Sequence, residues 1–173
     1  MDFAVLPVAS RNGNKLAAIF TDDNTRYRHA FYAPTAKSVH KILQLYINEC
    51  KARGYELKIV RCDSEWITTK SKELARKHGF VFKSSAPMSQ WQDGVSERHM
   101  RTWGDRVRCV LKDQQRGPEF WEYAGDMVIE TTNCAPISAE ALTTPWEPWW
   151  GSQPDTSHFR MPLMRRELSR LQD

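Results

Sequence analysis

Short apolar runs alternate with turn-forming residues over the first part of the chain. Runs at 3–9 and 15–21 are separated by the sequence R-N-G-N, which contains the Asn-Gly pair typical of hairpin connections. A third run, 27–33, follows the sequence D-D-N-T, another turn composition. The pattern predicts three consecutive short strands paired as an antiparallel meander.

After Pro34 the apolar residues recur at helical spacing. Residues 35–53 place one apolar stripe on a helix that Gly54 closes. A short strand at 57–60 then delivers Asp63 just past its end, a helix follows at 69–78, and a last strand is predicted at 80–82. The element order predicts an α/β fold in which helices flank a mixed five-stranded sheet.

A basic amphipathic helix is predicted after residue 93. Asp93 and Gly94 have the composition of a loop ending in a helix N-cap, which places Glu97 in the first turns. The apolar stripe contains Val95, Met100, Trp103, Val107, Val110 and Leu111, and the opposite stripe contains Arg98, Arg101, Arg108 and Lys112.

A further helix is predicted to start near Pro118. Its buried face is predicted to contain Phe120, Trp121, Ala124, Met127, Val128 and Thr131. Helical periodicity is lost after Pro136, so we divide the chain into a domain at 1–136 and an irregular Trp/Pro-rich segment with a tail at 137–173. Trp146, Trp149 and Trp150 are expected to pack over the core, with stacking on unpaired bases as the alternative.

Charge and composition limit the classes of function. The chain has 173 residues and a formal net charge of +4, and contains neither a long apolar run nor a basic leader, so we expect an intracellular protein. Basic residues exceed acidic ones by five over 51–83 and by three over 95–116. This surplus is typical either of a polyanion-binding surface or of an ordinary solvated face.

The cysteines are predicted to be free. Cys50 and Cys109 lie on apolar helical faces and are expected to be core thiols, and no Cys or His spacing matches a zinc site. We therefore predict neither disulfides nor structural zinc.

Three carboxylates are candidates for a common site. Asp2 opens the first strand, Asp63 follows the fourth, and Glu97 lies on a helix that can pack against the sheet. If the first and fourth strands are neighbours, the three converge, and close carboxylates require divalent cations with oxygen ligands between them. The alternatives are a chain-terminal residue for Asp2, a turn residue for Asp63 and a helix-dipole partner for Glu97.

Several ordered motifs resemble the catalytic core of retrotransposon integrases of the Ty1/copia type, within the retroviral integrase and transposase superfamily. T-D-D-N-T-R-Y at 21–27 is similar to D-D-x-S-R-Y, and R-C-D-S-E-W at 61–66 to R-x-D-x-G-x-E-aromatic. Q-D-G-V-S-E-R-H-M-R-T at 92–102 is similar to Q-N-G-V-A-E-R-x-N-R-T and is the most specific. Downstream, F-W-E-Y-A, the pair Asn133 and Pro136, and T-P-W-E-P-W-W-G-S-Q-P match further family segments.

The resemblance implies a ribonuclease-H-like fold and a catalytic, metal-binding trio of Asp2, Asp63 and Glu97. It implies that two Mg²⁺ or Mn²⁺ ions support attack of a DNA 3′-hydroxyl on target phosphodiesters, which joins element DNA to target DNA in the nucleus. DNA is then the partner, and a homo-oligomer is possible. The residues expected to bind nucleic acid are Arg61, Lys83, Gln92, Arg98 and Arg101.

The chain also departs from the family pattern. Asp63 and Glu97 are separated by 33 residues rather than the usual ~35, the Gly expected between Asp63 and Glu65 is missing, and Asp93 replaces an Asn. Asp2 lies at the start of the sequence, and the flanking zinc and DNA-binding modules of an integrase are absent. We therefore expect a truncated copy. The alternatives are an inactive fragment that binds nucleic acid nonspecifically and a ribonuclease H.

Overall fold

The computed structural model of the chain describes residues 1–84 and 90–159, and within 90–98 it describes the backbone alone. Its first sheet confirms the predicted meander: β1 (Asp2–Val5), β2 (Leu16–Thr21) and β3 (Arg28–Ala33) are antiparallel in the order β1-β2-β3. Gly13, at φ +79°, supplies the left-handed residue in the first turn. β1 ends before Pro7, which cannot donate to a ladder.

The second sheet pairs β4 (Ile59–Cys62) with β5 (Val81–Ser84) in parallel. The prediction of one mixed five-stranded sheet is wrong in this respect, because the described strands form two sheets. They adjoin where the Met1 ammonium group donates a hydrogen bond of 2.8 Å to the Arg61 carbonyl. Because β1 has four residues and begins at Asp2, it offers little length for a ladder with β4.

Two helices lie between β3 and β5 along the chain. α1 (Val39–Ala52) follows the 3₁₀ turn η1 (Ala36–Ser38), and α2 (Thr69–His78) follows η2 (Ser64–Trp66). Thr68 caps α2 by accepting a hydrogen bond from the Ser71 N–H group, and Gly79 ends it at φ +76°. The helix predicted at 69–78 is confirmed, and β4 and β5 lie one or two residues beyond their predicted positions.

The second helical pair is α3 (Gln90–Asp113) and α4 (Trp121–Asn133), joined through η3 (Pro118–Phe120). The backbone is already helical at Gln90, so the prediction of Asp93 as an N-cap is wrong. Glu97 therefore lies roughly two turns inside α3 instead of in its first turn.

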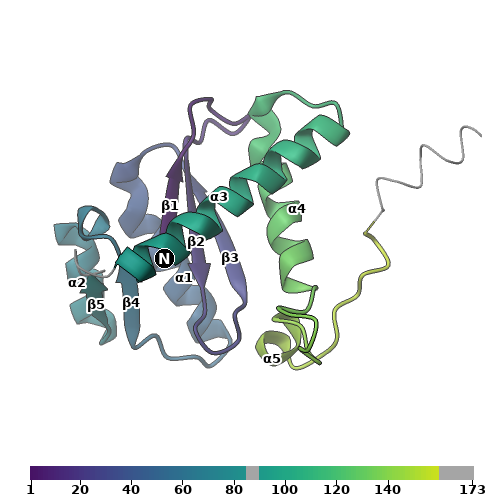
Figure 1. Cartoon of the computed structure of the whole chain (residues 1–173). Helices are drawn as coiled ribbons and strands as arrows, with labels where there is room; N and C mark the ends of the chain where they lie inside the picture. The colour runs from purple at the N-terminus through teal and green to yellow at the C-terminus, as the bar shows by residue number, and fades with distance from the viewer. Residues whose placement is uncertain (85–89, 160–173) are drawn as a thin grey trace, which may run out of the picture.

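β2 is the centre of the core because its side chains alternate between two layers. Leu16, Ala18 and Phe20 join the cluster that contains the buried face of α1, whereas Ala17 and Ile19 join the cluster formed with α3 and α4. Figure 1 shows this layering, with α3 crossing one face of the first sheet, α4 beside β3, and α1 behind the strands.

Some predicted burial is wrong. Cys50 is buried as expected, but Cys109 is exposed. On α4, Trp121, Ala124 and Val128 are buried as predicted. The partly exposed Phe120, Met127 and Thr131 are replaced at the buried face by Glu122, Gly125, Ile129 and Asn133.

The Trp-rich segment forms a short helix, α5 (Trp146–Trp150). Trp149 is 4% exposed and belongs to the α1 cluster, and Trp146 packs against that cluster. The predicted packing of these two rings over the core is confirmed. Across the described ranges, no helix has the length and apolar character needed to span a bilayer.

Candidate active site

Asp2 and Asp63 are brought to one end of the molecule by contacts on either side of them. Asp2 is the first residue of β1 and pairs with Ile19, whereas Asp63 directly follows β4. The Met1 ammonium group donates to the Arg61 carbonyl, and the Phe3 ring stacks on Trp66 with centroids 4.1 Å apart. These contacts hold the segments that carry the two acids side by side.

The charges of the Asp2 and Asp63 carboxylates both affect the pKa of the Cys62 thiol. Its thiol is 3% exposed, and burial is the main cause that raises its pKa to about 11. The chain's amino group opposes this increase in pKa, and the charges of Asp63 and Asp2 add to it. Both acids therefore lie within electrostatic reach of the same buried sulfur atom.

Asp63 does not serve the turn in which it lies. It occupies the N-cap position of η2, but its exposed side chain accepts no capping hydrogen bond there. Asp2 is half-buried, and its charge acts on Arg28 of β3. The turn-former alternative for Asp63 thus has no side-chain hydrogen bond in its favour, although the Asp63 carbonyl accepts a hydrogen bond of 3.1 Å from the Trp66 N–H group.

Only the backbone of Glu97, the third member of the predicted trio, lies within the described structure. Its backbone lies in α3, which packs along β1, but its side chain, with those of Gln92 and Arg98, lies outside the described residues. Within the ranges whose side chains are described, no three His, Cys, Asp or Glu residues form a group able to hold a metal ion. The convergence of the three acids remains a prediction.

Three of the predicted nucleic-acid contacts are described, and all three are exposed: Arg61, Lys83 and Arg101. Arg61 and Lys83 are partners in the β4–β5 register, so their side chains lie on the same face of that sheet. Arg61 also approaches Asp23 at 3.9 Å. Arg61 on β4 and Lys83 on β5 thus lie near the end of β4 that Asp63 follows.

Phe3 and Trp66 hold the segments that carry Asp2 and Asp63 together, and this role was not predicted from the sequence. Trp66 was visible as the aromatic residue of the R-C-D-S-E-W motif, but nothing in the sequence identified Phe3 as its partner. The pairing depends on β1 and β4 meeting in space, which a local pattern does not encode.

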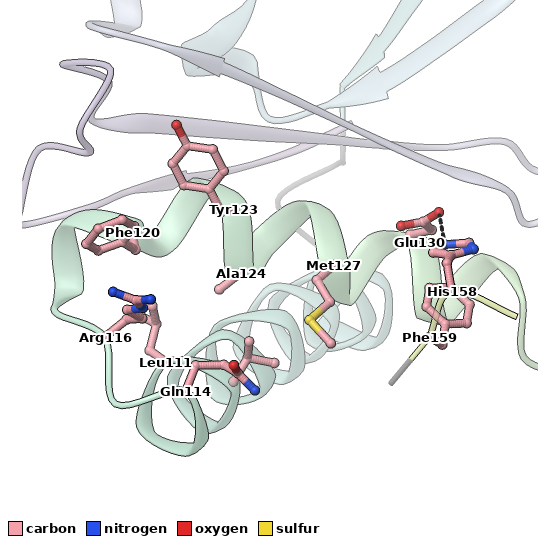
Figure 2. A pocket seen from close by; sticks show the side chains of 11 residues that line it. Leu111, Gln114, Arg116, Phe120, Tyr123, Ala124, Met127, Glu130, His158 and Phe159 are labelled. Atoms are coloured by element: carbon pink, nitrogen blue, oxygen red, sulfur yellow. Dashed lines mark hydrogen bonds and ion pairs between the residues drawn. The ribbon is translucent and has the colours of Figure 1, made fainter. Parts of the chain in front are cut away.

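A groove of about 440 Å³ lies between the end of α3 and α4. Figure 2 shows Met127, Phe120 and Phe159 along it, with His158 bonded to Glu130 at 3.0 Å. Its described lining contains neither Asp2 nor Asp63. We therefore place the candidate chemistry at the β1–β4 junction.

Comparison with known proteins extends the motif analysis. No protein-family model matches the chain. The chain is 25% identical over 159 residues to the retrovirus-related Pol polyprotein from transposon TNT 1-94 of Nicotiana tabacum. That alignment covers 90% of this chain and 12% of the polyprotein, so the chain spans a small part of its relative's length.

Solved integrase structures have the same fold. The simian T-cell lymphotropic virus intasome, in complex with the PP2A regulatory subunit B56 gamma, matches with a TM-score of 0.66 at 12% identity, covering 92% of this chain and 58% of that chain. The HTLV-2 integrase catalytic core in complex with magnesium, in a trimeric form, gives 0.60 at 11% identity, covering 84% and 92%. The BIV integrase catalytic core gives 0.59 at 16% identity, covering 86% and 93%.

These matches confirm the resemblance seen in the motifs: the chain is similar in sequence to part of a retrotransposon Pol polyprotein and has the ribonuclease-H-like α/β fold of retroviral integrase catalytic cores.

Proposed function

We propose that the chain is an integrase-type polynucleotidyl transferase that joins the 3′ ends of element DNA to target DNA by attack on phosphodiesters. The observation that carries this proposal is the junction of β1 and β4, where Met1 bonds to Arg61 and Phe3 stacks on Trp66. The charges of Asp2 and Asp63 both raise the pKa of the Cys62 thiol, which supports the proposal that the two acids share a site.

The available donors suit a hard divalent cation. Asp2 and Asp63 provide the oxygen ligands that Mg²⁺ and Mn²⁺ prefer, and Glu97 is the proposed third ligand. Two such ions, when bound, supply activation of the attacking hydroxyl and stabilisation of the departing oxygen. The chain's own contribution is to hold the carboxylates together despite their mutual repulsion, through contacts made by residues next to them in sequence.

Basic side chains around the acids are proposed to hold the DNA backbone. The exposed groups of Arg61, Lys83 and Arg101, together with Gln92 and Arg98, would contact phosphates. Phosphate contacts position a duplex without reading its sequence, so binding is expected to be strongly salt-dependent and weakly sequence-specific. Because the proposed substrate is genomic DNA, we propose that a functional chain acts in the nucleus.

An inactive, DNA-binding chain is the second candidate function. The observation that favours it is the shortened 33-residue spacing between Asp63 and Glu97. A change in spacing alters where α3 presents Glu97 without removing the basic surface. In this case the fold and nonspecific DNA binding persist without catalysis.

A strand-transfer assay separates the two functions. The wild-type chain, Asp63→Asn and Glu97→Gln are incubated with Mn²⁺, pre-processed DNA ends and target DNA. Asp113→Asn, an exposed change near the end of α3, is the matched control. We expect joined product from the wild type and the control, and a loss of at least ~10²-fold from the other two, because each removes an electrostatic contact to the reaction.

Equal product from wild type and Glu97→Gln would reject catalysis by the trio. Titration of Mg²⁺ by calorimetry gives a second readout: one or two ions bound per chain would count against the inactive alternative. Cleavage of the RNA strand of a hybrid duplex, without joining, would assign the chain to the ribonuclease H class instead.

A further inference from the structure

A groove of about 860 Å³ lies between the end of the first sheet and the helices α3 and α4. Three arginines from separate elements line it: Arg26 in the turn after β2, Arg28 on β3 and Arg106 on α3. None of the described lining residues is acidic. Apolar side chains form other parts of the wall, including Met127, Val128 and Pro136.

Arg28 is held in place by a buried amide. Asn133 is 2% exposed, and its Oδ1 atom accepts a hydrogen bond of 2.9 Å from the Arg28 N–H group. Its Nδ2 atom donates to the Arg28 carbonyl at 2.8 Å. Asn133 thus pairs with Arg28 as a neighbouring strand would, and fixes the backbone from which the guanidinium extends into the groove.

Arg106 is oriented by a hydroxyl group of α4. The Thr132 hydroxyl donates to the Val128 carbonyl at 2.6 Å, which leaves its lone pairs free to accept. Arg106 Nη1 donates to this oxygen at 3.1 Å. The guanidinium has five N–H donors, so one bond to Thr132 leaves further donors available for a ligand.

Two guanidinium groups at one groove repel each other. Burial and the charge of Arg106 both lower the pKa of Arg28, and Asp2 opposes this decrease. Arg26 is partly neutralised by Asp23 at 3.2 Å. An anion bound between Arg28 and Arg106 would relieve their repulsion and form charge-assisted hydrogen bonds with both.

We propose that this groove is a phosphate-binding subsite for a nucleic-acid strand, in which Arg28 and Arg106 flank one phosphodiester and the apolar wall contacts the adjoining sugar. The inference rests on the proposed function in one respect, that the substrate is nucleic acid. The influence of Asp2 on Arg28 connects the subsite to the carboxylates. A strand bound there continues toward the candidate active site.

Fluorescence anisotropy with a labelled DNA duplex tests this subsite. The solution contains EDTA, so that binding is measured without metal chemistry. The variants are Arg28→Gln, Arg106→Gln and Arg106→Glu. Arg108→Gln is the matched control, because Arg108 is also exposed on α3, pairs with Asp105 and does not line the groove.

We expect each Arg→Gln change in the groove to weaken binding about tenfold and to reduce the slope of log K against log salt by about 0.9, as loss of one phosphate contact does. Arg106→Glu should weaken binding further, and Arg108→Gln should stay within about twofold of wild type. Arg106 is exposed, so its variants keep the test valid if Arg28→Gln melts at a lower temperature.

Equal weakening by Arg106→Gln and Arg108→Gln would overturn the subsite, since nonspecific charge would then explain both. Absence of DNA binding by the wild type would also overturn it. Stabilisation of the wild type by inorganic phosphate, with no effect of the groove variants on DNA binding, would assign the groove to a free ion. Catalysis is measured separately in the strand-transfer assay, so failure of the catalytic proposal does not change the outcome of this metal-free binding test.

Discussion

Glu122 on α4 accepts a hydrogen bond of 2.6 Å from the side-chain amide of Asn14, which lies 108 residues earlier in the chain. Ser10 and Asn12 donate to the same carboxylate at 2.7 and 2.5 Å. The carboxylate is therefore bonded by three donors, although Glu122 is only 4% exposed. This cluster anchors the β1–β2 turn on α4, and through it the layer that contains α3 is tied to β1.

Glu122→Gln should destabilise the fold. The amide nitrogen that replaces one oxygen can only donate, so it faces at least one of the three donors and leaves it unsatisfied. We expect a loss of roughly 2–4 kcal/mol in the free energy of unfolding and a fall in Tm of about 5–15 °C. Thermal unfolding followed by circular dichroism measures this, with the exposed Glu73→Gln as control. A Tm equal to that of the control would show that the cluster contributes little.

The strands and helices were predictable where the local pattern suffices. β2 is an apolar run bounded by turn residues and α1 has one apolar stripe at helical spacing, and both elements are confirmed. Glu122 and Asn133 were visible inside family motifs, but their partners lie 105 to 112 residues away. Their burial therefore had no local signal.

The candidate site was predictable up to a condition on topology. Convergence of Asp2 and Asp63 requires the first and fourth strands to lie close together, and the hydrogen bond from Met1 to the Arg61 carbonyl joins the two segments next to these acids. The extent of pairing between β1 and β4 depends on a few backbone hydrogen bonds, and spacing along the sequence does not determine them. Cys109 was assigned to the core because its helical stripe is broad, and a small rotation of α3 decides its exposure.

Replacement of Trp149 or Trp150 by Ala should change the stability of the fold by different amounts. Trp149 stacks on Tyr27 with centroids 5.2 Å apart and is 4% exposed, so Trp149→Ala should cost about 3–5 kcal/mol of stability. Trp150 is 38% exposed and lies 3.3 Å from the Arg53 guanidinium carbon, a cation–π contact worth ~0.5–1 kcal/mol. Urea unfolding of both variants measures the difference.

The same pair tests the base-stacking alternative. If Trp150 stacks on unpaired bases, Trp150→Ala should weaken binding of single-stranded DNA while its effect on stability stays small. We expect instead that its affinity for DNA equals that of wild type, because the ring is engaged with Arg53. Anisotropy with a single-stranded probe distinguishes the two outcomes.

The four free thiols should react at different rates. Cys109 is exposed, whereas Cys50 and Cys62 are 4% and 3% exposed and burial raises the pKa of both. With a pKa of about 11, only about one Cys62 thiol in a thousand is ionised at pH 8. We expect one fast phase with Ellman's reagent in the native protein, which Cys109→Ser removes. Cys134 is partly exposed, so a fast phase of more than one thiol that persists in Cys109→Ser would contradict the burial of Cys50 and Cys62.

Divalent metal should stabilise the chain through its carboxylates. Asp2 and Asp63 repel each other in the folded state and are far apart in the unfolded chain, so a cation that they share binds the folded form preferentially. At about 100 times the dissociation constant, Mg²⁺ or Mn²⁺ should add ~2.7 kcal/mol, which raises Tm by roughly 5–10 °C, and EDTA should reverse the increase. Asp63→Asn should abolish the increase in Tm, whereas Asp113→Asn should keep it. An increase of the same size in both variants would place the ion elsewhere on the surface, and the proposed metal site at the β1–β4 junction would have to be abandoned.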